Sequence, residues 1–192
     1  MKKDKFKQNK LSDQIVKYCS PTLARLKSGN VFSVPCEDLQ DMQYEIRSLN
    51  QRLAAKGIKI IPLRYSCKRC LLYVFRPTAL KCDLADEQAY KILKDLGYKS
   101  CHPGECIGSL LKRLNSSRQF PHEIGLFLGY PPEDVCGYIK NKGKRSKCTG
   151  HWQVYGDENV ALARFESFKR CTQIFCKMAA LGLPIEELAV AG

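Results

Sequence analysis

A long amphipathic segment followed at once by two β-rich runs constrains the fold of this chain most strongly. The apolar residues of segment 37–56 recur at three- and four-residue steps, at Leu39, Met42, Ile46, Leu49 and Leu53. This spacing predicts a helix with one buried stripe, which Gly57 ends as a left-handed C-cap. The runs 58–64 and 70–76 are rich in β-formers, so we expect a hairpin with a five-residue loop.

Helices are expected on both sides of this unit. Ser20 is predicted to cap, and Pro21 to open, a short helix that ends at Gly29. Periodicity and caps predict further helices over 11–18, 87–96, 105–114, 121–128, 132–140 and 158–181, and extended segments over 31–34 and 151–155. The order indicates a helix-rich, mixed α+β fold with a β-hairpin plus one further strand packed against several helices.

Composition supports one compact domain over residues 11–192. The chain has 192 residues and is 44% hydrophobic, which is enough for a sizeable core. No apolar run approaches the roughly 20 residues that span a bilayer, and no apolar stretch follows the Lys-rich start. We therefore expect a cytoplasmic protein without a membrane partner. In a reducing cytosol the eleven cysteines are expected to be thiols or metal ligands.

The net charge of +13 is concentrated in two short segments. Residues 1–10 form a basic tail that we predict to be disordered, and residues 140–147 form a basic loop that we predict to be mobile. Both segments could bind nucleic acid or an acidic partner. A solvated charge run is the commoner meaning of such segments, so nucleic-acid binding is the less favoured alternative.

The segments 121–128 and 132–140 have the spacing of a helix-turn-helix. In that arrangement Glu133 and Asp134 would face DNA and repel its phosphates. We therefore interpret the pair as a tight αα-hairpin.

Two cysteine pairs offer a metal site. Cys67 and Cys70 flank the hairpin loop, and Cys101 and Cys106 lie at the start of a predicted helix. Four thiolates at such spacings can hold zinc, and iron is the alternative metal. The competing interpretation is that all four are ordinary thiols.

A second candidate site combines one histidine with two thiols. His122 and Glu123 follow Pro121 in the first predicted helical turn, where unpaired N–H groups favour an anion. Glu123 can equally serve the helix dipole alone. Cys148 adjoins the basic loop and Cys19 precedes a predicted helix start, and both positions favour thiolate. We expect Cys19, His122 and Cys148 to meet around a cavity.

Two arginines and two aromatic residues complete the predicted pocket. Arg25 and Arg76, with Trp152 and Tyr155, could bind an anionic or aromatic ligand, although alternating aromatic residues more often pack in a core. The sequence lacks a Gly-rich phosphate loop, a paired-carboxylate spacing and a metalloprotease signature, so nothing in it requires an enzyme.

Several motifs together resemble one known family. Residues 120–131 read Phe-Pro-His-Glu-Ile-Gly-Leu-Phe-Leu-Gly-Tyr-Pro, residues 19–24 read Cys-Ser-Pro-Thr-Leu-Ala, and residues 72–77 read Leu-Tyr-Val-Phe-Arg-Pro. With Gly150 and Trp152, these motifs are similar to those of a bacterial family, common in anaerobes, that is known only as a domain of unknown function. The resemblance implies one compact cytoplasmic domain and no particular activity.

Two functions therefore stay open. The favoured one is a cytoplasmic protein that handles a small anionic ligand or a metal, with thiol or redox chemistry possible at Cys19, His122 and Cys148. The alternative is a basic module that binds nucleic acid or an acidic partner through residues 1–10 and 140–147.

Overall fold

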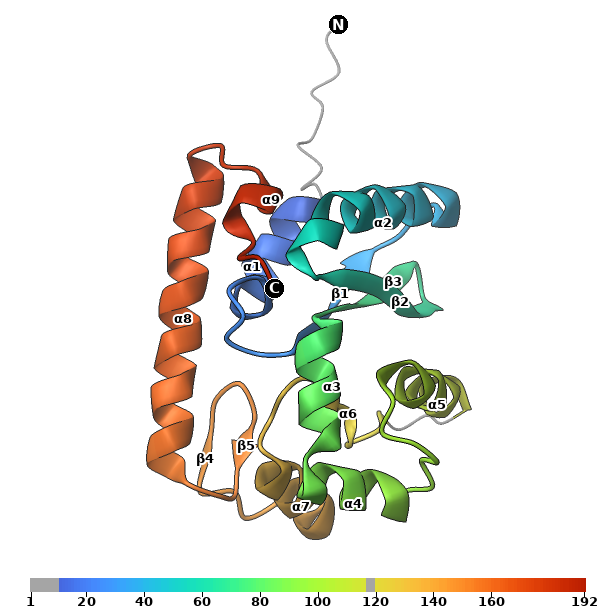
Figure 1. Cartoon of the computed structure of the whole chain (residues 1–192), viewed down its shortest axis with the longest axis vertical. Helices are drawn as coiled ribbons and strands as arrows, with labels where there is room; N and C mark the ends of the chain where they lie inside the picture. The colour runs from blue at the N-terminus through green and yellow to red at the C-terminus, as the bar shows by residue number, and fades with distance from the viewer. Residues whose placement is uncertain (1–10, 117–119) are drawn as a thin grey trace, which may run out of the picture.

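A three-stranded antiparallel sheet with the order β1-β3-β2 lies at the centre of the upper half of the molecule (Figure 1). The computed structural model describes residues 11–116 and 120–192. The strands are β1 (Gly29–Pro35), β2 (Lys59–Ser66) and β3 (Arg69–Phe75). A second, two-stranded sheet pairs β4 (Cys148–Thr149) with β5 (Gln153–Val154).

Helices make up most of the described residues, which confirms the predicted helix-rich α+β class. They are α1 (Leu11–Leu23), α2 (Leu39–Leu53), α3 (Pro77–Ala85), α4 (Glu87–Asp95), α5 (Pro103–Ser116), α6 (Ile124–Phe127), α7 (Pro132–Asn141), α8 (Glu158–Ala180) and α9 (Ile185–Leu188), with a 3₁₀ turn η1 (Ala54–Lys56) after α2. The predicted tail, residues 1–10, lies outside the described residues.

The amphipathic segment folds as its spacing predicts. The Asp38 side chain caps α2 by accepting hydrogen bonds from the backbone N–H groups of Gln40 and Asp41. Gly57 ends η1 at a φ of 67°. The stripe residues Ile46, Leu49 and Leu53 are buried. The hairpin also forms, but its loop has two residues, Cys67 and Lys68, rather than the predicted five. Both have positive φ, as a tight hairpin turn requires, so the strands extend further than expected.

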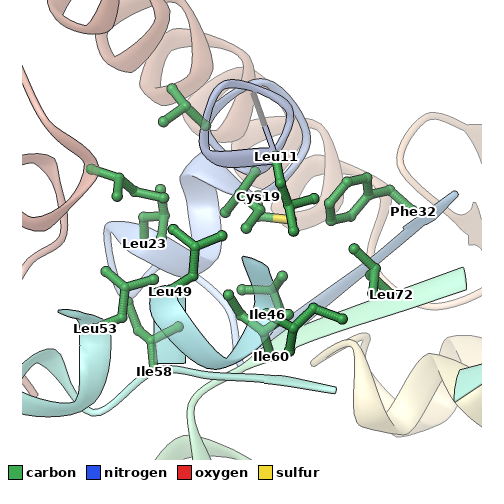
Figure 2. Close-up of a cluster of buried hydrophobic side chains, with 14 of the residues drawn as sticks. Leu11, Cys19, Leu23, Phe32, Ile46, Leu49, Leu53, Ile58, Ile60 and Leu72 are labelled. Carbon is green, nitrogen blue, oxygen red and sulfur yellow. The ribbon is translucent and has the colours of Figure 1, made fainter. Parts of the chain in front are cut away.

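The central strand β3 separates two cores because its side chains alternate between faces. Cys70, Leu72 and Val74 face a core built with α1, α2 and α9 (Figure 2). Tyr73 and Phe75 face a second core with α3, α4 and α5. A smaller third cluster lies between the β4–β5 hairpin and α8. Both faces of the sheet are covered, in agreement with the nearly continuous apolar run of β3.

Three helices differ from the predictions: α1 is longer, α3 was not predicted and α6 is shorter. The α1 helix continues through Pro21 to Leu23, and the Ser20 hydroxyl donates to the Val16 carbonyl within the helix instead of capping a new one. Pro77 begins the unpredicted helix α3. The predicted helix 121–128 shortens to α6 because residues 121–123 wind through i to i+3 hydrogen bonds.

The longest helix in the described part of the chain is α8, with 23 residues. Asp157 caps its start, as predicted, and Gly182 follows its end at a φ of 95°. Neither α8 nor another described helix combines the length and apolarity needed to cross a membrane.

Candidate functional site

The motif segment 120–134 separates two hollows of different character. On one side is an aromatic pocket of about 360 Å³, whose lining includes Phe120, His122, Tyr130, Val135, Tyr138 and Trp152. On the other side two adjoining hollows of about 380 and 410 Å³ share Asp83, Gly129 and Arg164. We call these two together the polar cleft. Tyr130 lines both the aromatic pocket and the polar cleft.

The polar cleft is lined by residues of α3, of α8 and of the loop after α1. Helix α3 contributes Asp83, α8 contributes Arg164, and the loop contributes Lys27. Gly129, in the turn between α6 and α7, also lines it. Segments distant in sequence thus bring their charged side chains to one opening.

Lys27 is a buried residue whose ammonium group lies against two aromatic rings. Only 8% of the residue is exposed, and its Nζ lies 4.8 Å from the ring centroid of Tyr130 and 5.7 Å from that of Phe168. Among residues 11–116 and 120–192, Nζ has no hydrogen bond and no ion pair. Burial lowers the pKa of Lys27 from 10.5 to about 8. Its charge also contributes to lowering the pKa of the nearby His151.

Ser28 and Asp83 form a hydrogen-bonded pair that lines the polar cleft. The Ser28 hydroxyl donates to the Asp83 carboxylate, and the Ser28 carbonyl accepts from the backbone N–H of Arg76 at 2.8 Å. Burial raises the pKa of Asp83, while the Ser28 hydrogen bond and the charge of Arg164 oppose that rise. Gly129 has a φ of 71°, and a Cβ there would lie 3.0 Å from Ser28 Oγ. A side chain at position 129 would therefore be strained against this pair.

The two ends of the polar cleft carry opposite charge. Arg25, Lys27 and Arg164 lie at the end beside the loop after α1, against the single carboxylate of Asp83. The other end carries four further carboxylates, those of Asp86, Glu133, Asp134 and Asp157. This arrangement suits a dipolar small molecule whose anionic group lies at the Lys27 end.

The aromatic pocket is shaped by Trp152 and its partner Asp134. The Trp152 ring stacks on Tyr130 with centroids 4.8 Å apart, and its Nε1 donates to Asp134 Oδ2 at 2.6 Å. The other carboxylate oxygen accepts the backbone N–H groups of Tyr155 and Gly156, each at 2.7 Å. Asp134 is buried and fixes the β4–β5 hairpin on α7, so the predicted exposure of this residue is wrong.

His122 and Tyr155 occupy different places around this pocket. The exposed His122 lines it, with its ring 5.0 Å from that of Tyr138. Tyr155 lies against Gly137, where an added Cβ would be 2.4 Å from the tyrosine ring, and its hydroxyl donates to the Lys144 carbonyl at 3.1 Å. Of the two predicted aromatic ligand-binding residues, the structure thus places Trp152 in the pocket lining.

The predicted thiols do not join His122 around one cavity. Cys19 is fully buried in the first core, where Figure 2 shows its sulfur among apolar side chains, and burial raises its pKa strongly. Cys148 packs against the Trp152 cluster. Its pKa is raised by desolvation and by Glu158, contrary to the lowering expected from the basic loop. The prediction that the three side chains meet is therefore wrong for Cys19.

Arg76 is buried and donates four hydrogen bonds to backbone carbonyls. Its guanidinium donates to the carbonyls of Thr22, Leu23, Lys56 and Val190, each at 2.7 Å. These carbonyls belong to the last turn of α1, to η1 and to the segment after α9. The structure thus places Arg76 as a clamp between three segments. Arg25 lies nearby, donates to the Ala191 carbonyl at 3.2 Å and also lines the polar cleft.

Glu123 is engaged in a second buried cluster. Its Oε1 accepts from the Tyr98 hydroxyl at 3.1 Å and lies 2.5 Å from Arg113 Nε. Only 2% of Glu123 is exposed, so its carboxylate interacts with Tyr98 and Arg113 and is shielded from solvent. It connects the α4–α5 loop and α5 to the turn before α6.

The four cysteines of the metal hypothesis do not assemble. No group of three or more His, Cys, Asp or Glu side chains in the described ranges could hold a metal ion. Cys67 is exposed at the hairpin turn and Cys70 lies in the first core. Cys101 is exposed before α5, whereas Cys106 lies in the second core. The sheet separates the two buried thiols, so the predicted four-thiolate site is wrong.

The nucleic-acid alternative stays a prediction. Residues 1–10 lie outside the described part of the chain. In the basic loop, Lys147 donates from Nζ to the Gly156 carbonyl at 2.6 Å. The four-residue α6 is buried, which favours the αα-hairpin interpretation over a helix-turn-helix.

Sequence reasoning missed the charged residues of the polar cleft. Lys27, Asp83 and Arg164 come from three separate segments and follow no motif spacing. Of the residues that line the polar cleft, Leu126, Gly129, Tyr130 and Pro131 belong to the motif 120–131, and they could have indicated this side of the segment.

Comparison with known proteins gives one family. A family model described as "Protein of unknown function (DUF3793)" matches residues 15–189. No curated protein and no solved structure gives a significant match.

Proposed function

We propose that this chain, which belongs to the DUF3793 family of proteins of unknown function, binds a small organic carboxylate in the polar cleft. Lys27 is the anchoring cation, and Arg164 and Arg25 share its end of the cleft. The ligand class agrees with the small anionic ligand expected from the sequence, but the location moves from Cys19 and His122 to Lys27.

The observation that carries this proposal is that Lys27 is largely buried against two aromatic rings, with no ion pair to a carboxylate among residues 11–116 and 120–192. Removing an ammonium group from water is costly unless an anion or hydrogen-bond acceptors replace the water. Two aromatic faces compensate only part of that cost. A carboxylate entering the polar cleft would supply the missing partner.

The distribution of charge favours a monocarboxylate over a phosphate. A doubly charged anion would meet the carboxylate of Asp83, which lines the same hollow as Lys27, and the acidic far end of the cleft. A single carboxylate suffers less repulsion, and hydroxyl or ammonium groups on its other end could donate to Asp86 or Asp157.

The place of action that we propose is the bacterial cytoplasm. All eleven cysteines are free thiols, and a reducing compartment keeps them so. The bacterial source rests on the motif resemblance of residues 120–131.

Calorimetric titration with lactate, glycerate and inorganic phosphate tests the proposal. We expect saturable binding of a monocarboxylate, and Lys27→Met should weaken it by about 10-fold or more because a charge-assisted contact is lost. Lys169→Met is the matched control, since Lys169 is an exposed residue of α8 whose Nζ lies 3.9 Å from Glu166. This control should bind like the wild type.

Two results would overturn the proposal. One is the absence of saturable carboxylate binding by the wild-type chain. The other is equal affinity of wild type and Lys27→Met, which would show that binding takes place elsewhere.

A further inference from the structure

Lys27 presents a primary amine under conditions that suit a nucleophile. Its Nζ lies over the rings of Tyr130 and Phe168, and no carboxylate among the described residues pairs with it. Burial lowers its pKa to about 8, so part of the amine is unprotonated near neutral pH. An amine in a desolvated aromatic setting attacks carbonyl carbon more readily than a solvated ammonium group.

The same hollow holds the other groups that such a reaction needs. Arg25 and Arg164 line it and can hold a carboxylate. Asp83 also lines it, and its carboxylate can accept a proton from the amine and return it to the leaving hydroxyl. The Ser28 hydroxyl is hydrogen-bonded to Asp83 and fixes the carboxyl in place.

We propose that Lys27 forms an imine with a small keto or aldehydo acid whose carboxylate is held by Arg164 and Arg25. This inference rests on the proposed binding of a carboxylate in the polar cleft. It specifies the substrate class as a carboxylate with an adjacent carbonyl group and gives Lys27 a covalent role.

The atoms balance without a further reactant. The Nζ lone pair forms a bond to the carbonyl carbon, and the carbonyl π electrons move to oxygen, which takes a proton. The nitrogen loses one proton to give a neutral carbinolamine. A second proton, for which Asp83 is the acid in this hollow, converts the hydroxyl to departing water. The nitrogen lone pair forms the C=N bond as water leaves, so amine and carbonyl become iminium and water, and nothing is oxidised.

Borohydride trapping with pyruvate tests the imine directly. The full-length protein is incubated with pyruvate, reduced with sodium borohydride, digested and mapped by mass spectrometry. We expect one reduced pyruvate adduct, on Lys27, formed well before any adduct on exposed lysines such as Lys169. Lactate has no ketone, so it should compete for the cleft and slow the trapping at Lys27.

A conservative variant distinguishes covalent chemistry from binding. Lys27→Arg keeps a cation but has no amine that can form an imine, so it should give no adduct at position 27, and calorimetry measures how much lactate binding it retains. Lys169→Arg should bind and trap like the wild type. Circular dichroism of each variant checks folding, and the wild-type peptide map stays decisive if Lys27→Arg does not fold.

The outcomes separate the two proposals. Saturable lactate binding without a Lys27 adduct, or with adducts spread evenly over exposed lysines, would overturn the imine and leave carboxylate binding intact. If the wild-type protein shows neither saturable lactate binding nor a Lys27 adduct, the imine and the carboxylate site are both overturned. Preferential trapping at Lys27 that lactate suppresses would support both.

Discussion

Arg76 and Lys27 are two buried cations that the molecule treats in opposite ways. Arg76 is 3% exposed and donates four hydrogen bonds of 2.7 Å to carbonyls from three segments. Lys27 is 8% exposed, rests on two aromatic rings and lines the polar cleft. Burial lowers the pKa of both residues, so both are desolvated, but within residues 11–116 and 120–192 Arg76 donates hydrogen bonds from its charged group and Lys27 does not.

The comparison separates a structural charge from a candidate functional one. A buried cation with every donor engaged stabilises the elements that supply the acceptors. A buried cation without acceptors raises the free energy of the fold, and its position at a hollow gives a ligand access to it. The difference teaches that burial alone does not identify a site, whereas burial with missing partners does.

Removal of Arg76 should produce the largest effect. Arg76→Met removes four hydrogen bonds to backbone carbonyls, and we expect the free energy of unfolding to fall by about 3–5 kcal/mol. Urea denaturation under reducing conditions measures it. Lys27→Met, with a similar change in side-chain volume, should leave stability nearly unchanged or slightly higher at pH 7. Equal losses in the two variants would remove the distinction between the two cations.

The pH dependence of stability should single out Lys27. Its folded pKa of about 8 lies below the ordinary 10.5, so between these values the unfolded chain keeps a proton that the folded chain has lost. Wild-type stability should therefore rise across that window relative to Lys27→Met, by about 3 kcal/mol in total. Urea titrations at pH 7.5 to 10.5 would measure the difference. A flat difference would mean that Lys27 is solvated in the folded state.

Replacement by alanine should destabilise the protein more at Gly129 than at Gly182, which also has a positive φ. Gly129→Ala places a Cβ at positive φ and 3.0 Å from Ser28 Oγ, so we expect a loss of about 1–3 kcal/mol. Gly182 also has positive φ but has open space around it, and Gly182→Ala should cost about 1 kcal/mol. Thermal unfolding of both variants measures the contrast. If Gly182→Ala is the more harmful change, the packing of Gly129 against Ser28 is unimportant.

Neutralising the basic loop should have the smallest effect. The triple replacement of Lys142, Lys144 and Arg145 by Gln removes three charges from the α7–β4 connection, none of which lines the polar cleft. We expect lactate affinity to stay within about 2-fold of wild type, because exposed charges are screened. Calorimetry at physiological salt measures it. A large loss would shift the binding site toward this loop.

Periodic patterns predicted the parts of the fold that local physics decides. The stripe of α2, the two strands β2 and β3 and the caps at Asp157 and Gly182 follow from spacing and turn chemistry alone. The passage of α1 through Pro21 was missed because tertiary packing of Cys19 and Leu23 in the first core outweighs the local break.

The candidate site was less predictable than the fold. Hollows border the motif 120–131 on two sides, and Trp152 lies in the lining of one of them. The charges of the polar cleft come from the loop after α1, from α3 and from α8, and their meeting depends on tertiary packing. A lysine between Leu26 and Ser28 has no local feature that distinguishes it from a solvent-exposed lysine.

The most direct test is an NMR titration of Lys27 in protein labelled with ¹³C-lysine, using Lys27→Arg to assign its signal. The account predicts a pKa of about 8 for Lys27 in the free protein, because the amine is buried without an anion. Saturating lactate should raise that pKa, since a bound carboxylate stabilises the ammonium form. A value near 10.5, or a pKa that lactate does not change, would contradict the assignment of Lys27 as the anchor of a carboxylate site.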